Sequence, residues 1–152
     1  MKVGIAADHA GIHFIKALSD YIKQKGFDAV PIGPAVPFDD YPDTAEALAT
    51  ALLEKKIERG ILICGSGVGV SVAANKFPGI RAAVCHDSYS AHQGVEHDNM
   101  NIICLGARII GIELAKELAD KFLHATFSGE ERHVRRSGKI DAIENKFLKK
   151  EI

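Results

Sequence analysis

Apolar residues along the chain follow two alternating patterns. Short runs in which nearly every position is apolar alternate with longer stretches whose apolar residues recur every three to four positions. The short runs predict strands buried on both faces, because parallel strands covered by helices on both sides show little polar alternation. The expected strands are residues 2–7, 27–32, 59–64, 80–85 and 101–105.

The longer stretches predict amphipathic helices. In the first of them Ile15, Leu18 and Ile22 share a face, and Gly26 favours an end there because glycine accepts left-handed backbone. A loop with Pro34, Pro37 and Pro42 follows the second strand, and a charged segment, residues 129–139, precedes the last helix. The expected helices are residues 12–25, 43–57, 69–76, 86–96, 110–126 and 139–150.

Strands that alternate with helices predict an α/β fold, with a parallel sheet between two layers of helices. We find no internal repeat or interdomain linker and expect residues 1–152 to form a single domain. Ligands of such sheets bind at the carboxyl ends of the strands. The residues expected at that edge are Asp8, His9, the segment 64–69, the segment 85–87 and the segment 105–108.

Composition narrows the functional classes. With 47% hydrophobic residues, 26% charged residues and a net charge of −1, the chain has the balance of a soluble globular protein. That charge gives no reason to expect nucleic-acid or membrane partners. Three cysteines without a CxxC motif argue against a disulfide framework or a zinc site. We therefore expect a cytoplasmic protein that requires no metal.

The segment 63–76, ICGSGVGVSVAANK, holds three glycines at alternate positions between a strand and a helix. Its spacing differs from the dinucleotide fingerprint G-x-G-x-x-G, and it lacks the lysine of a Walker loop. One interpretation is a set of amides that bind an anion or a developing oxyanion. The alternative is a tight turn in which glycine only permits close packing.

Cys64 stands at the start of this loop. A nearby helix N-terminus favours the thiolate, which would make Cys64 a base or nucleophile, whereas a small buried apolar residue is the alternative. For Cys85 and Cys104 we prefer the buried role. The pair Asp8–His9 ends a strand, and His97 lies in a polar cluster where it can act as a general acid or base.

Arg132 and Arg136 are four residues apart, which on a helix places both guanidinium groups on one face as a phosphate clamp. A solvated charged turn is the alternative. His13, His86, His92 and His124 have no distinguishing sequence context.

Seven motifs together resemble the ribose-5-phosphate isomerase B family, which includes galactose-6-phosphate and allose-6-phosphate isomerases. They occur in family order and extend to about residue 145. The motifs are DHAG at 8–11, DYPD at 40–43, CGSGVGVSVAANK at 64–76, GIRAA at 79–83, EHDNMN at 96–101, LGARIIG at 105–111 and RHVRR at 132–136.

The resemblance implies a Rossmann-like three-layer αβα sandwich with a five-stranded parallel sheet. It also implies metal-independent and cofactor-free interconversion of ribose 5-phosphate and ribulose 5-phosphate through a cis-enediolate. A homodimer, sometimes paired into a tetramer, would form its active sites at the subunit interface, with the helix at about 139–150 in that interface.

Residue by residue, the resemblance makes Cys64 the base that moves the proton and His97 the residue that opens the sugar ring. Ser66 takes the place of a threonine in the catalytic loop. The backbone of Gly65, Ser66, Gly67, Val68 and Gly69 would hold the enediolate oxygen. The remaining substrate-binding positions are Asp8, His9, Tyr41, Asp98, Arg108, Arg132 and Arg136, the last two of which would bind phosphate.

Three departures in the sequence bear on the base and the substrate. Val70 stands where other members carry a glutamate base, so the chain resembles the cysteine type. Asp98 replaces the usual asparagine, and the segment before Arg132, usually Gly-Gly, reads Gly129-Glu130-Glu131 and is one residue longer. Extra carboxylates beside a phosphosugar make allose 6-phosphate, galactose 6-phosphate or a tetrose phosphate alternative substrates. A nucleotide-binding module and a cysteine hydrolase are the alternatives from other classes.

Overall fold

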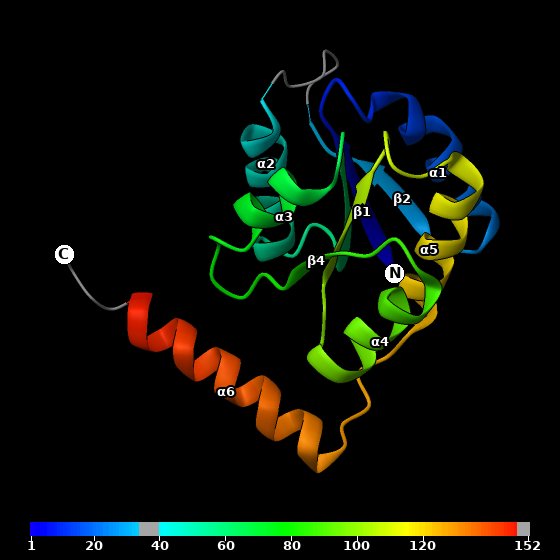
Figure 1. Ribbon diagram of the computed structural model, residues 1–152. Coiled ribbons are helices and arrows are strands. Elements are labelled where there is room, and N and C mark those ends of the chain that lie inside the picture. Colours follow the sequence, from blue (N-terminus) through cyan, green and yellow to red (C-terminus); the bar gives the residue numbers. More distant parts are fainter. Residues whose placement is uncertain (34–39, 149–152) are drawn as a thin grey trace.

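A parallel sheet of five strands forms the centre of the protein (Figure 1). The computed structural model describes residues 1–33 and 40–148. The strand order is β2-β1-β3-β5-β4, and all four pairings are parallel. The strands are β1 (Lys2–Ala7), β2 (Asp28–Pro31), β3 (Arg59–Cys64), β4 (Ala82–Val84) and β5 (Ile102–Gly106).

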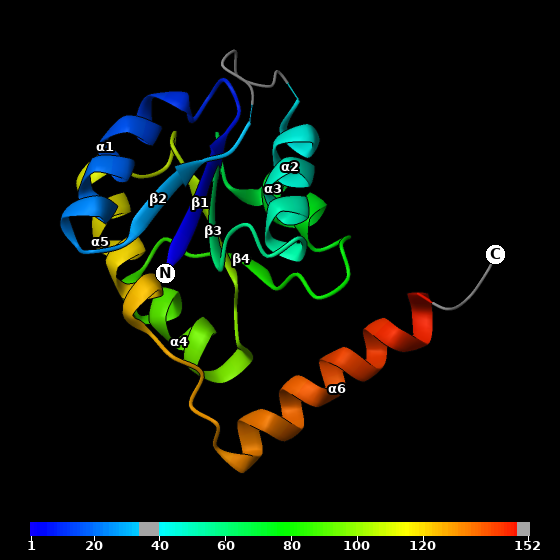
Figure 2. The same ribbon diagram turned by 180° about the vertical axis from the view of Figure 1, so that it is seen from behind.

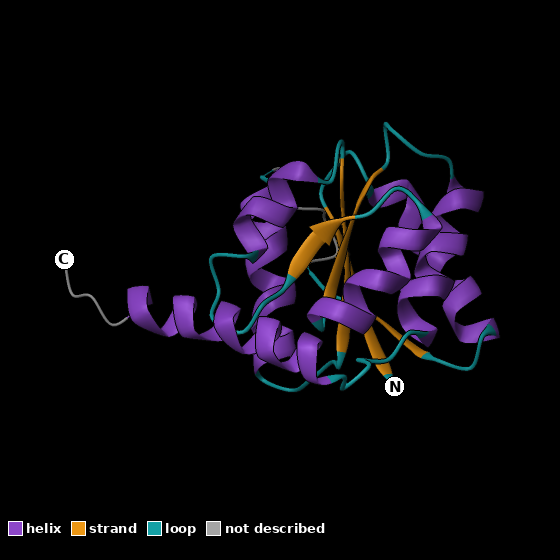
Figure 3. Ribbon diagram, turned by 60° about the horizontal axis from the view of Figure 1, so that its bottom comes forward, coloured by secondary structure: helices purple, strands orange, loops and turns teal. Residues whose placement is uncertain are grey.

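Helices cover both faces of the sheet, so the molecule has three layers (Figures 2 and 3). One face is covered by α1, α4 and α5, and the other by α2 and α3. This arrangement confirms the α/β sandwich predicted from the alternating patterns. The helices are α1 (Ile12–Gln24), α2 (Tyr41–Leu53), α3 (Val68–Ala74), α4 (Ser88–Asp98), α5 (Ile112–His124) and α6 (Glu131–Leu148).

Each central strand contributes side chains to two hydrophobic cores. On β3, Ile61 and Ile63 pack beneath α1 and α5, while Leu62 packs beneath α2. All three are fully buried. Because neighbouring residues of a strand point to opposite faces, both positions of the alternation must be apolar. The continuous apolar runs of the sequence follow from this double burial.

The order in which the strands are added to the sheet reverses between β1 and β3. From β1 the chain builds β2 on one side and β3 on the other, so the connections after β1 and β3 leave toward opposite faces. A crevice forms at the carboxyl ends of strands where this happens, and it is the usual ligand site of such sheets. Asp8, directly after β1, and Cys64, the last residue of β3, lie at this point.

Helix α6 begins eight residues earlier than we predicted. The charged segment 129–139 lacks a continuous apolar stripe and was expected to precede the helix, but from Glu131 onward it is helical. Its buried residues are His133 and Ser137, one turn apart. The helix therefore packs through polar residues, and the apolar periodicity on which the prediction depended is absent from this segment. The predicted loop with Pro34 and Pro37 and the predicted helix end at 149–150 lie outside the described residues.

Helix α6 extends away from the rest of the molecule (Figures 1 and 2). It packs against α4 and leaves Val134, Ile140 and Ile143 about half exposed or more. No helix within residues 1–33 and 40–148 is both long enough and apolar enough to cross a membrane.

Candidate active site

A pocket of about 360 Å³ opens at the carboxyl edge of the sheet, at the crevice between β1 and β3. It brings together residues from four separate parts of the sequence: the ends of β1, β3 and β5, and the start of α2. Its lining is Asp8, His9, Ala10, Tyr41, Cys64, Gly65, Ser66, Gly69, Arg108 and Ile109.

Cys64 is the last residue of β3, and its sulfur receives a hydrogen bond from the loop that follows. The N–H of Gly67 donates to Cys64 Sγ at 3.1 Å. Gly67 reaches this position with a φ of +80°, a conformation that favours glycine. An amide directed at a sulfur stabilises negative charge there. The loop therefore has a geometry suited to a thiolate.

Ser66 orders the other end of the loop. Its Oγ accepts a hydrogen bond at 3.2 Å from the N–H of Val68, the first residue of α3. The amides of Gly67 and Val68 are thus both engaged by side chains of the loop itself. The expectation that loop amides hold an enediolate oxygen stays a prediction.

Asp8 and His9 differ in exposure although they are adjacent. The Asp8 side chain is buried, and one of its carboxylate oxygens accepts a hydrogen bond from the N–H of Ala10 at 2.8 Å. His9 is exposed and lines the pocket. The turn packs tightly on β3, because a Cβ at Gly11 would lie 2.4 Å from Ile63 Cγ2. This close packing explains the glycine of the DHAG motif.

Tyr41 and Arg108 form the outer wall of the pocket. A Cβ at Gly69 would lie 2.8 Å from the Tyr41 ring, so the absence of a side chain at 69 lets the ring lie against the loop. The Arg108 side chain lies beside Gly65, and the Arg108 N–H donates to the Gly65 carbonyl at 3.0 Å. Arg108 thus places a permanent positive charge beside the pocket.

The other two cysteines are buried, Cys104 within β5 and Cys85 directly after β4. Burial raises the pKa of Cys85 to about 11, with a smaller contribution from the charge of Asp87. Burial also raises the pKa of Cys104. Both remain neutral thiols near pH 7, in agreement with the buried role that we preferred for them.

His97, Asp98, Arg132 and Arg136 lie apart from this pocket. His97 and Asp98 form the last turn of α4, which ends at the amino edge of the sheet just before β5. Both arginines are exposed and lie on the first turns of α6 (lower part of Figure 1). One chain therefore holds the predicted site residues as two groups at opposite edges of the sheet.

His97 is held by two neighbours. Its ring stacks on His133 with 4.0 Å between centroids, and its Nδ1 lies 2.8 Å from Gln93 Nε2. The His133 side chain is buried, with its Nδ1 2.6 Å from Ser128 Oγ. Burial lowers the pKa of His133, and the neighbouring His97 lowers it further. No pattern in the sequence indicates this stacked pair.

Two further contacts concern the residues that depart from the family pattern. Arg132 Nε donates to a carboxylate oxygen of Glu130 at 2.9 Å, so one unexpected carboxylate pairs with a predicted phosphate ligand. Arg81 joins α4 to α6, because it donates to the Asp98 carbonyl at 3.4 Å and forms an ion pair with Asp141. Sequence reasoning did not single out Arg81.

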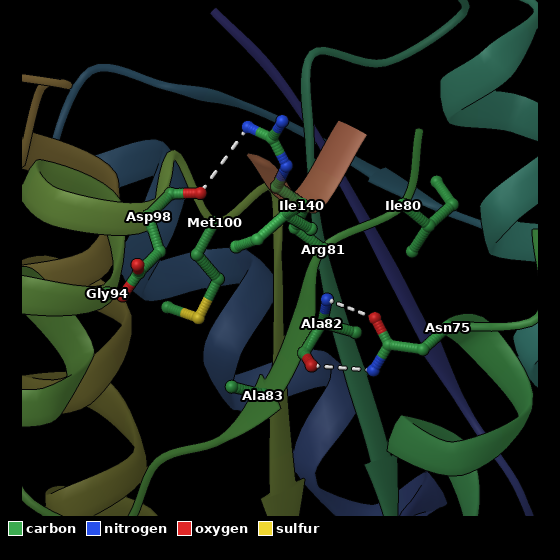
Figure 4. A pocket seen from close by; sticks show the side chains of 9 residues that line it. All are labelled: Asn75, Ile80, Arg81, Ala82, Ala83, Gly94, Asp98, Met100 and Ile140. Atoms are coloured by element: carbon green, nitrogen blue, oxygen red, sulfur yellow. Dashed lines mark hydrogen bonds between the residues drawn. The ribbon is translucent and has the colours of Figure 1, made fainter. Parts of the chain in front are cut away.

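A second hollow, of about 240 Å³, lies beside these contacts (Figure 4). Its walls are mostly apolar, and Figure 4 shows Ile140 of α6 near Arg81 and Met100. The lining residues are Asn75, Ile80, Arg81, Ala82, Ala83, Gly94, Asp98, Met100 and Ile140.

Comparison with known proteins identifies relatives over nearly the whole chain. A family profile described as Ribose/Galactose Isomerase matches residues 3–140. Ribose-5-phosphate isomerase B of Escherichia coli is 38% identical over 146 residues, which cover 95% of this chain and 97% of that protein. D-erythrulose-4-phosphate isomerase of Pectobacterium atrosepticum is 44% identical over 131 residues, which cover 85% of this chain and 86% of that protein.

A solved structure gives the same result. Ribose-5-phosphate isomerase B of Clostridium thermocellum is 44% identical and superposes with a TM-score of 0.90, covering 97% of this chain and 99% of that one. The structural match agrees with the fold implied by the seven motifs.

Proposed function

Because the chain belongs to the ribose/galactose isomerase family, we propose that it interconverts ribose 5-phosphate and ribulose 5-phosphate. The observation that carries this proposal is Cys64, whose sulfur accepts the Gly67 N–H in the pocket that also holds Asp8, His9 and Arg108. A base, an ordered loop and a fixed positive charge in one pocket are what proton transfer next to a carbonyl requires.

The reaction follows from the position of the thiolate. With the sugar in its open-chain form, Cys64 removes the proton from carbon 2, and the electron pair moves to the oxygen of carbon 1 to give a cis-enediolate. The proton then returns to carbon 1, while the hydroxyl proton of carbon 2 passes to the oxygen of carbon 1, so that carbon 2 becomes the carbonyl and carbon 1 carries the hydroxyl. The backbone of residues 65–69 holds the enediolate oxygen, and Ser66 orders that loop.

The remaining roles belong to the second group of residues. His97 opens the sugar ring as a general acid and base, with its ring oriented by Gln93. Arg132 and Arg136 lie one turn apart on α6 and bind the phosphate. Asp98 lies beside His97, at the position where the family usually has asparagine.

We propose that the active enzyme is a homodimer in which each pocket is completed by the partner. The Cys64 pocket and the His97–Arg132 group lie at opposite edges of the sheet, so one chain cannot bring them to one substrate. Ile109 in the pocket lining and Val68 and Val72 on α3 are more than half exposed, and α6 exposes Ile140 and Ile143. A second copy would bury these apolar side chains while supplying the missing residues.

A tetrose phosphate is the second candidate substrate. Its support is the relative from Pectobacterium, a D-erythrulose-4-phosphate isomerase 44% identical to this chain, together with the carboxylates of Asp98 and Glu130. The ratio of kcat/KM between ribose 5-phosphate and D-erythrulose 4-phosphate distinguishes the two. A ratio above one favours the pentose, and a ratio below one favours the tetrose.

The substitution Cys64→Ala tests the proposed base. We expect it to abolish the exchange of solvent deuterium into the substrate, because the loop remains but no group accepts the proton. Binding of the phosphosugar should change little, since Arg132 and Arg136 are untouched. Val70→Ala on the neighbouring helix is the matched control and should retain exchange. Near wild-type deuterium exchange in Cys64→Ala would refute the assignment of Cys64.

A further inference from the structure

Strands β4 and β5 separate before β5 ends. Their pairing extends to Val84 opposite Cys104, and the Cys85 N–H still donates to the Cys104 carbonyl at 3.3 Å. After this the chain turns toward α4, which begins at Ser88, while β5 continues to Gly106. In a continued parallel ladder the Gly106 N–H would donate to a carbonyl of β4. The departure of β4 removes that acceptor.

His86 supplies an acceptor in its place. The Gly106 N–H donates to His86 Nε2 at 2.9 Å. Because a backbone N–H can only donate, Nε2 must carry a lone pair, and the proton of the neutral ring must lie on Nδ1. The structure therefore assigns one tautomer to a histidine that had no distinguishing sequence context.

Gly106 in turn supports the catalytic loop. It lies opposite Cys64 in the pairing of β3 with β5. A Cβ at Gly106 would lie 2.7 Å from the carbonyl carbon and oxygen of Ser66, so the loop rests directly on this backbone. The next residue, Ala107, donates its N–H to the Cys64 carbonyl at 2.9 Å. A shift of Gly106 would thus be transmitted to Cys64 and Ser66.

We propose that His86 is a positioning residue of the isomerase. By accepting the Gly106 N–H it fixes the end of β5, and through that strand end it fixes the loop that carries Cys64 and Ser66. His86 is half-buried and is not among the residues that line the pocket, so it acts without touching the substrate. The proposal depends on the proposed function in one respect: it requires Cys64 to perform the proton transfer.

Two substitutions at this position separate the acceptor from the bulk of the ring. His86→Phe keeps a planar ring but removes the acceptor, and His86→Gln restores an acceptor because its amide oxygen reaches about as far as Nε2. We expect His86→Phe to lower kcat roughly tenfold, the effect of about one lost hydrogen bond, with KM changed less than about twofold. His86→Gln should recover most of kcat.

Amide hydrogen exchange supplies a readout that does not depend on catalysis. In His86→Phe the amide of Gly106 should exchange faster, and in His86→Gln its protection should return toward that of the wild type. His124→Phe is the control, because His124 lies at the far end of α5 and bonds within its own helix. It should change neither kcat nor the exchange of Gly106.

The outcomes are distinct. Unchanged exchange at Gly106 in His86→Phe, or equal loss of kcat in the Phe and Gln variants, would overturn the positioning role. Faster exchange together with a selective loss of kcat and rescue by glutamine would support it. If Cys64→Ala keeps its deuterium exchange, the proposed base is wrong, and that result is independent of the exchange measured at Gly106.

Discussion

Three cysteines lie at or near the carboxyl ends of neighbouring strands, and their surroundings give them different chemistry. Cys64 faces the pocket and accepts the amide of Gly67. Burial raises the pKa of Cys85 to about 11, and it raises the pKa of Cys104 as well. Only a thiolate reacts readily with an alkylating reagent. The reactive thiol of this protein should therefore be Cys64.

This difference predicts selective alkylation. At about pH 8, iodoacetamide should modify Cys64 before Cys85 or Cys104, and activity should fall in step with that single modification. Ribulose 5-phosphate should slow the reaction by filling the pocket. Mass spectrometry of peptides taken during the reaction measures each site separately. Modification of Cys85 at the rate of Cys64 would contradict the prediction.

Among the strands, helices and loops, the sequence predicts those features that depend on a local pattern of residues. The strands were predicted because double burial makes them continuously apolar, and the loop at 64–69 because its glycines follow a strand. The start of α6 was missed because its contact face consists of His133 and Ser137, which are polar. His86 was missed for a related reason. Its partner, Gly106, is distant in sequence, and no periodicity reveals such a contact.

At the contact between α6 and α4 lies His133, whose surroundings favour the neutral form of its ring. His133 is buried against the His97 ring, and burial lowers its pKa below the usual value, with His97 as the next contributor. In the unfolded chain the same side chain titrates near its ordinary pKa of about 6.5. Between these two values the unfolded chain binds a proton that the folded protein does not, so stability falls as the pH falls.

We therefore expect acid to destabilise the protein through His133. The contribution is fully present above about pH 6.5 and is lost as the pH falls from there toward the lowered pKa of the folded state. Replacing His133 with glutamine should reduce this dependence, because glutamine does not titrate. Urea unfolding of both proteins at pH 7.5 and pH 5.5, at one protein concentration, measures it. Equal losses of unfolding free energy in the two proteins would contradict the prediction.

In the molecule as a whole, the predicted site residues are divided between two places. This division argues for a dimer in which each chain completes the site of the other. Each chain offers one pocket with Cys64 and one group with His97, Arg132 and Arg136, at opposite edges of its sheet. If the His97, Arg132 and Arg136 group of a second copy completes the Cys64 pocket of the first, a twofold axis places the first chain's group at the second chain's pocket in the same way. Two complete sites then form in each dimer, and the extended α6 lies across the contact.

Subunit mixing tests this pairing directly. Cys64→Ala and the double variant Arg132→Ala/Arg136→Ala should each be inactive alone. In a mixed dimer one site carries both defects, but the other combines the intact Cys64 of one chain with the intact arginines of its partner. Random exchange of equal amounts should therefore restore roughly a quarter of wild-type kcat, because about half of the dimers are mixed and each has one working site. If each site instead drew all its residues from one chain, every site would keep a defect, and mixing would restore no activity.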